Sequence, residues 1–173
     1  DDSIVRGTTL KMSIIKMMDR LKPKSIVIVS SAPQIRFPDC YGIDMAKMEG
    51  LVAFRAALEL LRERNMWHVV DEVYQKCKNQ VDLKDSEVVN FVTEIYAPFE
   101  AQEVSDKIAE MLGTPEVKAK IKIIFQTVEN LHIACPKNLG DWYFTGDYPT
   151  PGGNRVVNRA FMNWYEGSDA RAY

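Results

Sequence analysis

Apolar residues recur with the period of a helix near the start of the chain. From residue 8 to about residue 21 they lie three or four positions apart, which predicts one amphipathic helix. Its apolar positions are Leu10, Ile14, Met17, Met18 and Leu21. Lys22-Pro23-Lys24 then ends the helix, because proline disrupts a helix interior. The β-branched run S-I-V-I-V-S at 25–30 predicts a strand buried on both faces, as in a parallel sheet.

The middle of the chain is predicted to be mostly helical. Between about residues 46 and 80, two apolar stripes appear at helical spacing. The first stripe is Leu51, Phe54, Ala57, Leu58 and Leu61, and the second is Trp67, Val70, Val73, Tyr74 and Cys77. Asp85-Ser86-Glu87 can cap a further helix that reaches about Tyr96. Another helix is expected from about residue 100 to 112, with Gly113 as its C′ residue.

Short elements follow in the last third. In order, we expect a helix start at 114–116, a strand at 121–126, a helical turn at 128–133, a final strand at 141–149 and a flexible break at 150–153. A tail helix from 154 to about 165 would carry an apolar side that needs cover from this chain or a partner. That side consists of Val157, Ala160, Phe161 and Trp164.

Length and composition narrow the class of protein. The chain has 173 residues, enough for one sizeable core, with 46% hydrophobic residues and a net charge of −2. This charge balance argues against nucleic acid as a main partner. No apolar run is long enough for a membrane span, and no signal peptide is visible. The isolated cysteines Cys40, Cys77 and Cys135 favour reduced thiols and a cytoplasmic setting. His68 and His132 have no metal-ligand partner at helical spacing, so we interpret them as structural.

The first nine residues carry the candidate chemistry. Two adjacent carboxylates, Asp1 and Asp2, precede Ser3, and Gly7-Thr8-Thr9 opens the first helix. The N–H groups of a helix N-terminus can bind a phosphate, while the carboxylates suit sugar hydroxyls or hydrated Mg²⁺. A phosphoribosyl group combines these features. Aspartate and serine at a helix start are also ordinary N-caps, so spacing alone leaves both interpretations open.

The order of these residues adds a resemblance. D-D-S-I-V-R-G-T-T resembles the phosphoribosyl pyrophosphate (PRPP) signature of the type I phosphoribosyltransferases, which is a hydrophobic strand, two acids and a turn ending in Gly-Thr-Thr. The chain begins at the first acid, so we expect it to be cut from a longer one. With that strand, the loop, helix and strand would form a βαβ unit whose loop lies at the carboxyl end of a strand, where open α/β sheets bind ligands.

Further segments narrow the resemblance to one family. S-A-P-Q-I-R-F-P followed by Y-G-I-D-M at 41–45, and F-T-G-D-Y-P at 144–149, are similar to segments of the amidophosphoribosyltransferases (glutamine PRPP amidotransferases). The resemblance implies an α/β chain: a partial type I phosphoribosyltransferase fold, a mostly parallel sheet with flanking helices, plus a helix-rich C-terminal elaboration. Residues 1–173 would form a single partial domain without the N-terminal glutaminase domain. Its parts would be 1–45 with the loop and Y-G-I-D-M, 46–116 mainly helical, 117–149 with closing strands, and the tail 150–173.

The family resemblance also implies an activity and a site. Ammonia from glutamine would displace pyrophosphate from PRPP and give 5-phosphoribosylamine, the first step of purine synthesis. Asp1 and Asp2 would be the catalytic acids, engaging the ribose hydroxyls and Mg²⁺. The 5′-phosphate loop would consist of Ser3, Ile4, Val5, Arg6, Gly7, Thr8 and Thr9, with the role of Arg6 left open. No residue matches the family's N-terminal cysteine nucleophile, and the early strands of the family's transferase domain and its loop that closes over PRPP have no counterpart here, so this segment alone is predicted to be inactive.

The family resemblance also bears on an iron–sulfur cluster and on regulation. Some members hold an iron–sulfur cluster, but the first cysteine position aligns with Asp39, Cys40 is one place off, and no cysteine lies directly before F-T-G. We therefore predict no iron–sulfur cluster. The resemblance also implies a homo-oligomer inhibited by purine nucleotides. A nucleobase-salvage phosphoribosyltransferase, which Y-G-I-D-M disfavours, and a non-catalytic PRPP- or nucleotide-binding regulator, which the acid pair disfavours, are the alternatives.

Overall fold

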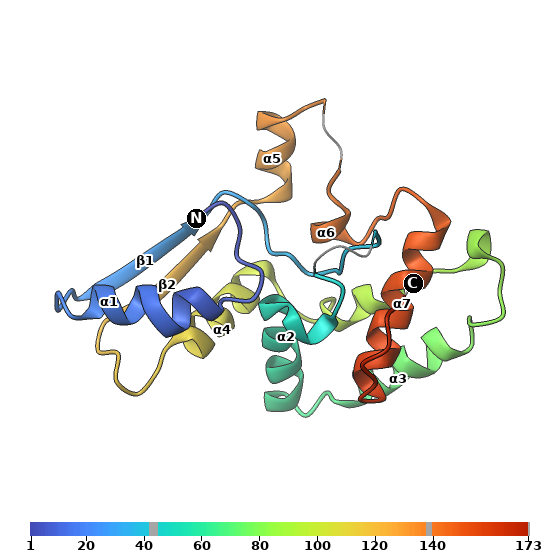
Figure 1. Ribbon diagram of the computed structural model, residues 1–173, viewed down its shortest axis with the longest axis horizontal. Helices are drawn as coiled ribbons and strands as arrows, with labels where there is room; N and C mark the ends of the chain where they lie inside the picture. Colours follow the sequence, from blue (N-terminus) through green and yellow to red (C-terminus); the bar gives the residue numbers. More distant parts are fainter. Residues whose placement is uncertain (42–44, 138–139, 173) are drawn as a thin grey trace.

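A computed structural model describes residues 1–41, 45–137 and 140–172. The chain has two parts (Figure 1). A two-stranded parallel sheet with the first helical segment lies at one end, and the helices α2, α3 and α7 gather at the other. α4 lies between them and contacts both α2 and the sheet. The expected α/β class is therefore confirmed.

The sheet joins two distant segments of the sequence. β1 (Ser25–Ser30) pairs in parallel with β2 (Lys120–Phe125), so that Ser25 lies opposite Lys120 and Ser30 opposite Phe125. The predicted strands at 25–30 and 121–126 are both present. Parallel strands need a crossover, and here the whole helical part of the chain between β1 and β2 supplies it.

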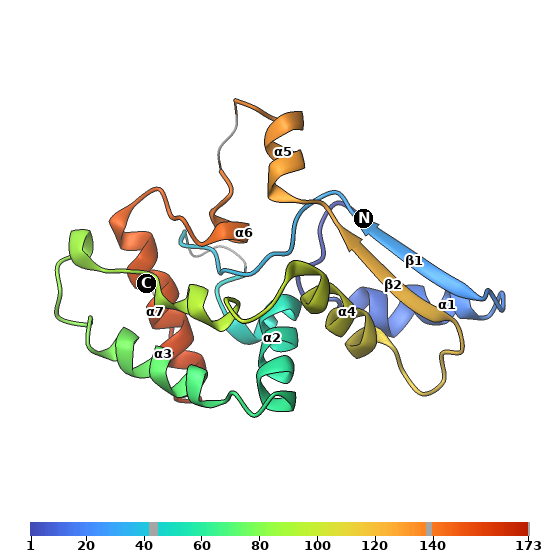
Figure 2. The ribbon, with the colours of Figure 1, turned by 180° about the vertical axis from the view of Figure 1, so that it is seen from behind.

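The prediction that β1 is buried on both faces is wrong. Ile26 and Ile28 are buried, whereas Val27 and Val29 are 51% and 55% exposed. Only one face of the sheet is covered, because α1 and α4 (Ala101–Leu112) pack on the same side. Figure 2 shows the strands in front of α1. The continuous apolar run of β1 therefore places isoleucines on the buried face of the sheet and valines on its solvent-exposed face.

The first predicted helix is present, but most of its predicted apolar face is not buried, since Met17 and Leu21 are 60% and 84% exposed. Thr8 and Thr9 are helical, a π-helical turn η1 (Leu10–Ile14) follows, and α1 (Ile15–Asp19) completes it. Leu10 and Ile15 face the core. The Asp19 carboxylate accepts hydrogen bonds from the N–H groups of Lys118 and Ala119 (3.1 and 2.9 Å), which ties the end of the helix to the start of β2.

The helical part contains the aromatic core. η2 (Met48–Gly50) leads into α2 (Val52–Glu63) and α3 (His68–Lys78), and α7 (Pro151–Tyr165) packs against them. Phe54 of α2 meets the rings of Phe161 and Trp164 of α7 edge-on, with centroids 6.2 and 4.8 Å apart. The predicted apolar face of the tail helix is therefore covered within this chain.

The predicted helix from Asp85 to about Tyr96 is wrong. Two short 3₁₀ turns, η3 (Asp85–Glu87) and η4 (Phe91–Ile95), flank an extended stretch. The Gln80 side chain accepts from the Val89 N–H (2.8 Å) and donates to the Val89 carbonyl (2.9 Å). The N–H and C=O groups of Val89 are therefore not available for the hydrogen bonds of a helix. The Asn90 side chain accepts from the Val92 N–H and so caps η4.

Three expectations in the last third also need correction. Pro115 and Glu116 form a turn, not a helix start. The predicted final strand at 141–149 is the helical turn α6 (Trp142–Thr145), ended by Gly146 in the left-handed region at φ +83°. The predicted break at 150–153 begins α7, with Pro151 in its first turn, as proline prefers. The turn predicted at 128–133 is confirmed as α5 (Val128–Ala134).

The Tyr143 carbonyl joins α6 to a distant segment of the chain. It accepts from the N–H groups of Arg36 and Phe37 (2.8 and 3.1 Å), a contact that no local pattern encodes. Residues 42–44 of Y-G-I-D-M and residues 138–139 before α6 lie outside the described residues. Among the helices that are described, none has the length and apolar content required to cross a bilayer.

Candidate functional site

The acid pair lies beside the carboxyl end of β1. The Asp1 amine donates to the Val29 carbonyl (2.9 Å), and the N–H groups of Ser31 and Ala32 donate to the carbonyls of Asp1 and Asp2 (both 3.0 Å). The two bonds of Asp1 follow the pattern of a parallel pair, and the Ala32 bond continues the contact to Asp2. Asp1 and Asp2 therefore extend along the sheet edge at the end where α/β proteins bind ligands.

The two carboxylates are exposed, and the residues that follow anchor them. The N–H of Ser3 donates to Oδ1 of Asp2 at 2.8 Å, which orients that carboxylate. Ile4 is only 3% exposed and packs into the core, so the loop is fixed immediately after the acids. Ser3 is half-buried and Val5 is partly buried.

Gly7 forms the turn between the acids and the helix. Its φ is +70°, a region that glycine adopts without steric cost, and a Cβ there would lie 2.8 Å from a Leu112 methyl group. Thr8 and Thr9 then open the helix and are exposed. The first N–H groups of a helix have no acceptor within the helix, and they carry its positive partial charge. The loop thus offers anion-binding donors within a few residues of the acid pair.

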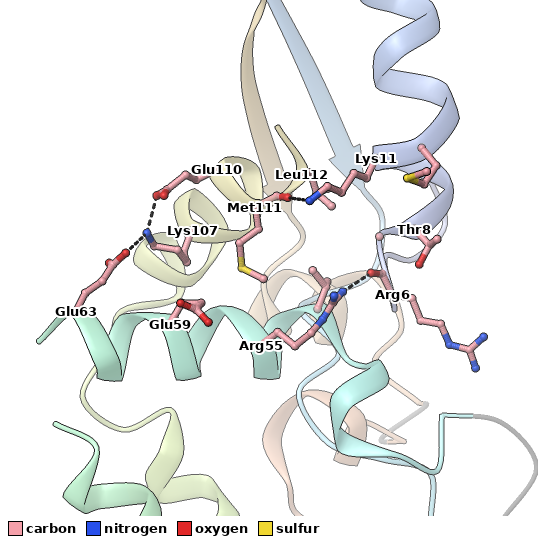
Figure 3. Close-up of a pocket in the computed structure, with 13 residues that line it drawn as sticks. Arg6, Thr8, Lys11, Arg55, Glu59, Glu63, Lys107, Glu110, Met111 and Leu112 are labelled. Carbon is pink, nitrogen blue, oxygen red and sulfur yellow. Dashed lines mark hydrogen bonds and ion pairs between the residues drawn. The ribbon is translucent and has the colours of Figure 1, made fainter. Parts of the chain in front are cut away.

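A hollow of about 450 Å³ lies on the other side of this loop (Figure 3). The loop, the first helix, α2 and α4 line it. Arg55 donates to the Arg6 carbonyl (2.7 Å), Lys11 Nζ donates to the Met111 carbonyl (2.7 Å), and Lys107 bonds Glu63 and Glu110. The sequence pattern did not point to Arg55, because it lies 49 positions from its partner on the buried-stripe helix.

The S-A-P-Q-I-R-F-P segment forms a second polar cluster. Gln34 accepts from the Arg36 guanidinium (3.1 and 2.9 Å) and donates to Ser105 (2.8 Å). Burial lowers the pKa of Arg36, and burial raises that of Tyr96, whose hydroxyl donates to the Arg36 carbonyl. Gln34 and Ser105 thus join this segment to α4 behind the sheet edge.

The side chains that could bind a metal ion form few clusters in the described residues. Across the described segments, no group of three or more His, Cys, Asp or Glu side chains gathers as a metal site. Cys40 is half-buried, Cys77 is buried and Cys135 is exposed. Mg²⁺ binds commonly through one or two carboxylates together with substrate phosphates and waters, and the exposed pair Asp1 and Asp2 fits that donor set.

The sheet edge and the loop together define an α/β protein with an acidic, phosphate-type loop at the carboxyl end of a parallel strand. Sequence comparison adds its relatives. The chain is 44% identical over 63 residues to the amidophosphoribosyltransferase of Escherichia coli (strain K12), covering 36% of this chain and 12% of that enzyme. It is 30% identical over 133 residues to the amidophosphoribosyltransferase of Saccharomyces cerevisiae, covering 71% and 26%. The enzyme of Lachancea kluyveri is 40% identical over 83 residues, covering 45% and 16%.

The resemblance predicted from the motifs is thus confirmed, and the chain is a sequence relative of the amidophosphoribosyltransferases. The matches span from 12% to 26% of the length of these curated relatives. No protein-family profile matches the chain. No solved structure gives a significant match.

Proposed function

We propose that this chain supplies the PRPP-binding loop of an amidophosphoribosyltransferase. The reaction forms a bond between the nitrogen of ammonia and the anomeric carbon of PRPP, while the bond from that carbon to pyrophosphate breaks. Ammonia loses a proton, and 5-phosphoribosylamine is the product. The relatives are named amidophosphoribosyltransferases, which denotes transfer of an amide nitrogen, so glutamine is the proposed source of the ammonia.

One observation carries this proposal: the hydrogen bonds between residues 1–2 and residues 29–32. They bring the two exposed carboxylates to the carboxyl end of β1, and the helix that begins at Thr8 follows them within a few residues. A phosphate bound at that helix start and a ribose extending toward the acids would use both features at once. The relatives support the same substrate by their sequence.

Different chemical groups of the loop would bind different parts of PRPP. The backbone N–H groups and hydroxyls of Ser3 to Thr9 would hold the 5′-phosphate, and Gly7 permits the close approach of the backbone. Asp1 and Asp2 would accept hydrogen bonds from the ribose hydroxyls and fix the orientation of the sugar. Mg²⁺, held by these carboxylates with the substrate phosphates, would neutralise charge on the leaving pyrophosphate.

The transition state sets what the site has to provide. As pyrophosphate departs, positive charge develops on the ribose ring, and the two nearby carboxylates would stabilise it electrostatically. Positioning by the phosphate loop reduces the entropy cost of bringing the ring and ammonia together. We expect the 173-residue chain by itself to make no phosphoribosylamine from glutamine, because the resemblance places ammonia production in a separate glutaminase domain. Purine nucleotides as inhibitors and a homo-oligomer remain expectations from the same resemblance.

The acid pair gives the decisive test. In the full-length protein, Asp1→Asn with Asp2→Asn should abolish phosphoribosylamine synthesis from added ammonia, which bypasses the glutaminase. PRPP–Mg²⁺ binding measured by calorimetry should weaken at least about tenfold, because hydrogen bonds to charged groups are lost. The matched control is Asp82→Asn with Asp147→Asn, which changes the same charge at exposed positions outside the loop.

The alternative functions predict different results when synthesis, nucleotide binding and transfer to a nucleobase are each measured. Retained synthesis in the Asp1 and Asp2 double variant would refute the assignment of the acids. Binding of purine nucleotides without PRPP–Mg²⁺ binding would indicate a regulator instead. Phosphoribosyl transfer to a nucleobase but not to ammonia would indicate a salvage enzyme.

A further inference from the structure

We infer that Arg55 is a positioning residue for the phosphate loop: from α2 it holds the back of the loop so that the N–H of Gly7 faces the ligand side. The inference rests on the proposed function and assigns a role to a helix to which the sequence motifs assign none. It concerns binding of the 5′-phosphate, since Arg55 touches the loop backbone and not the acids.

The loop is held from behind at two successive peptides. The N–H of Val52, at the start of α2, donates to the Val5 carbonyl at 2.8 Å, and Arg55 donates to the Arg6 carbonyl at 2.7 Å. Figure 3 shows the Arg55 side chain reaching the Arg6 carbonyl. Both donors come from the first turn of α2, so one rigid element fixes both peptides.

The direction of the N–H groups follows from peptide geometry. Every peptide bond of the described segments is trans. In a trans peptide the C=O and N–H groups point in opposite directions. Because the Arg6 carbonyl points to Arg55, the N–H of Gly7 in the same peptide points away from α2. The positive φ of Gly7 then turns the chain into the helix, so that this N–H and those of the helix start can converge on one anion.

Stability of α2 does not explain the arginine. A cation in the first turn of a helix faces the positive end of the helix dipole, which disfavours it. Nε of Arg55 is also buried without a hydrogen-bond partner among the described residues, an arrangement that costs free energy. An apolar side chain of similar length would fit this site better if folding were its only role.

Arg55 differs from the two lysines around the hollow in what its side chain binds. Lys107 is engaged by Glu63 and Glu110, and Lys11 by the Met111 carbonyl. Neither ammonium group bonds a carbonyl of the loop, and Lys11 reaches the loop only through its own backbone N–H, which donates to the Gly7 carbonyl at 3.0 Å. The Arg55 guanidinium does bond a loop carbonyl, and α-helical side chains tilt toward the helix N-terminus, which here is the direction of the loop.

The test compares Arg55→Met with Arg62→Met in the full-length protein. Arg62 lies on the same helix, pairs with Glu59 and does not touch the loop, so it controls for charge and side-chain length. We expect Arg55→Met to weaken binding of ribose 5-phosphate and of PRPP–Mg²⁺ by about tenfold each, the usual effect of losing a charged hydrogen bond. Arg62→Met should stay within about twofold, and Arg55→Lys, which keeps a donor, should recover most of the loss.

Hydrogen exchange supplies the second readout. Amides in residues 3–12 should exchange faster in Arg55→Met, while those of α2 and α4 keep the wild-type rate. Wild-type affinity for ribose 5-phosphate in Arg55→Met would overturn the inference. Faster exchange throughout α2 and α4 would also overturn it, because the arginine would then support folding. If the Asp1 and Asp2 double variant binds PRPP normally, the proposed function itself fails, whatever Arg55 does.

Discussion

The helical part and the sheet part of this chain differ in how completely they bury their apolar residues. Around α2, α3 and α7, the rings of Phe54 and Phe161 are fully buried. In the sheet, Val27 and Val29 alternate with buried neighbours and remain about half exposed. The helices thus bury their apolar residues more completely than the sheet does, and the candidate chemistry lies on the less enclosed sheet edge.

This difference shows how the loop obtains its rigidity. The loop begins on the sheet edge, but the donors of Val52 and Arg55 that hold it come from α2. Ile4 and Leu10 fix its two ends in the core. The candidate loop on an open edge is thus supported by α2, most of whose residues are buried, which is what pre-organised binding requires.

The largest expected effect tests the packing contrast directly. Phe161→Ala should lower the free energy of unfolding by about 3–5 kcal/mol, because it leaves a cavity beside Phe54 and Trp164. Val29→Ala, on the bare face of the sheet, should change it by less than about 1 kcal/mol. Urea denaturation measures both. A loss of several kcal/mol at Val29 would mean that its face is covered in solution, and the contrast would fail.

Glycines with positive φ sharpen the same comparison. At Gly146 a Cβ would lie 3.0 Å from the buried Phe37 ring, whereas at Gly7 it would meet the flexible end of Leu112. Gly146→Ala should therefore cost about 2–4 kcal/mol and Gly7→Ala about 1–2 kcal/mol. Gly167→Ala, with the same backbone strain and nothing within 4 Å, gives the strain alone, about 1 kcal/mol. Equal losses at all three positions would contradict the packing argument.

The smallest effect concerns pH and the buried thiol of the helical part. Burial, reinforced by Glu94, raises the pKa of Cys77 from 9.0 to about 12. Above pH 9 the unfolded thiol therefore ionises while the folded one keeps its proton, so the folded state loses stability as pH rises toward 12. Between pH 8 and pH 10 the wild type should lose about 1 kcal/mol more than Cys77→Ala.

Urea titrations of both proteins at each pH measure this difference, and all other titrating groups cancel in the comparison. Identical pH slopes would show that Cys77 is not desolvated. Thiol labelling at pH 8 gives an independent check: the exposed Cys135 should react much faster than Cys77.

Local patterns determined most elements of this protein. Helical periodicity predicted the first helix, α2, α3, α4 and α7, and the β-branched run predicted β1. The motifs predicted the family resemblance that the relatives confirm. These features depend on neighbouring residues and on residue order, so they can be read without knowing the fold.

Tertiary contacts decided what the patterns could not. The Gln80 side chain keeps Val89 extended where a helix was predicted, and the Tyr143 carbonyl bonds the segment after Pro33 where a strand was predicted. The bare face of β1 depends on which helices pack on the sheet. Arg55 reaches the loop across 49 positions. Such contacts join groups that are distant in sequence, and their energies outweigh local propensities of a few tenths of a kcal/mol per residue.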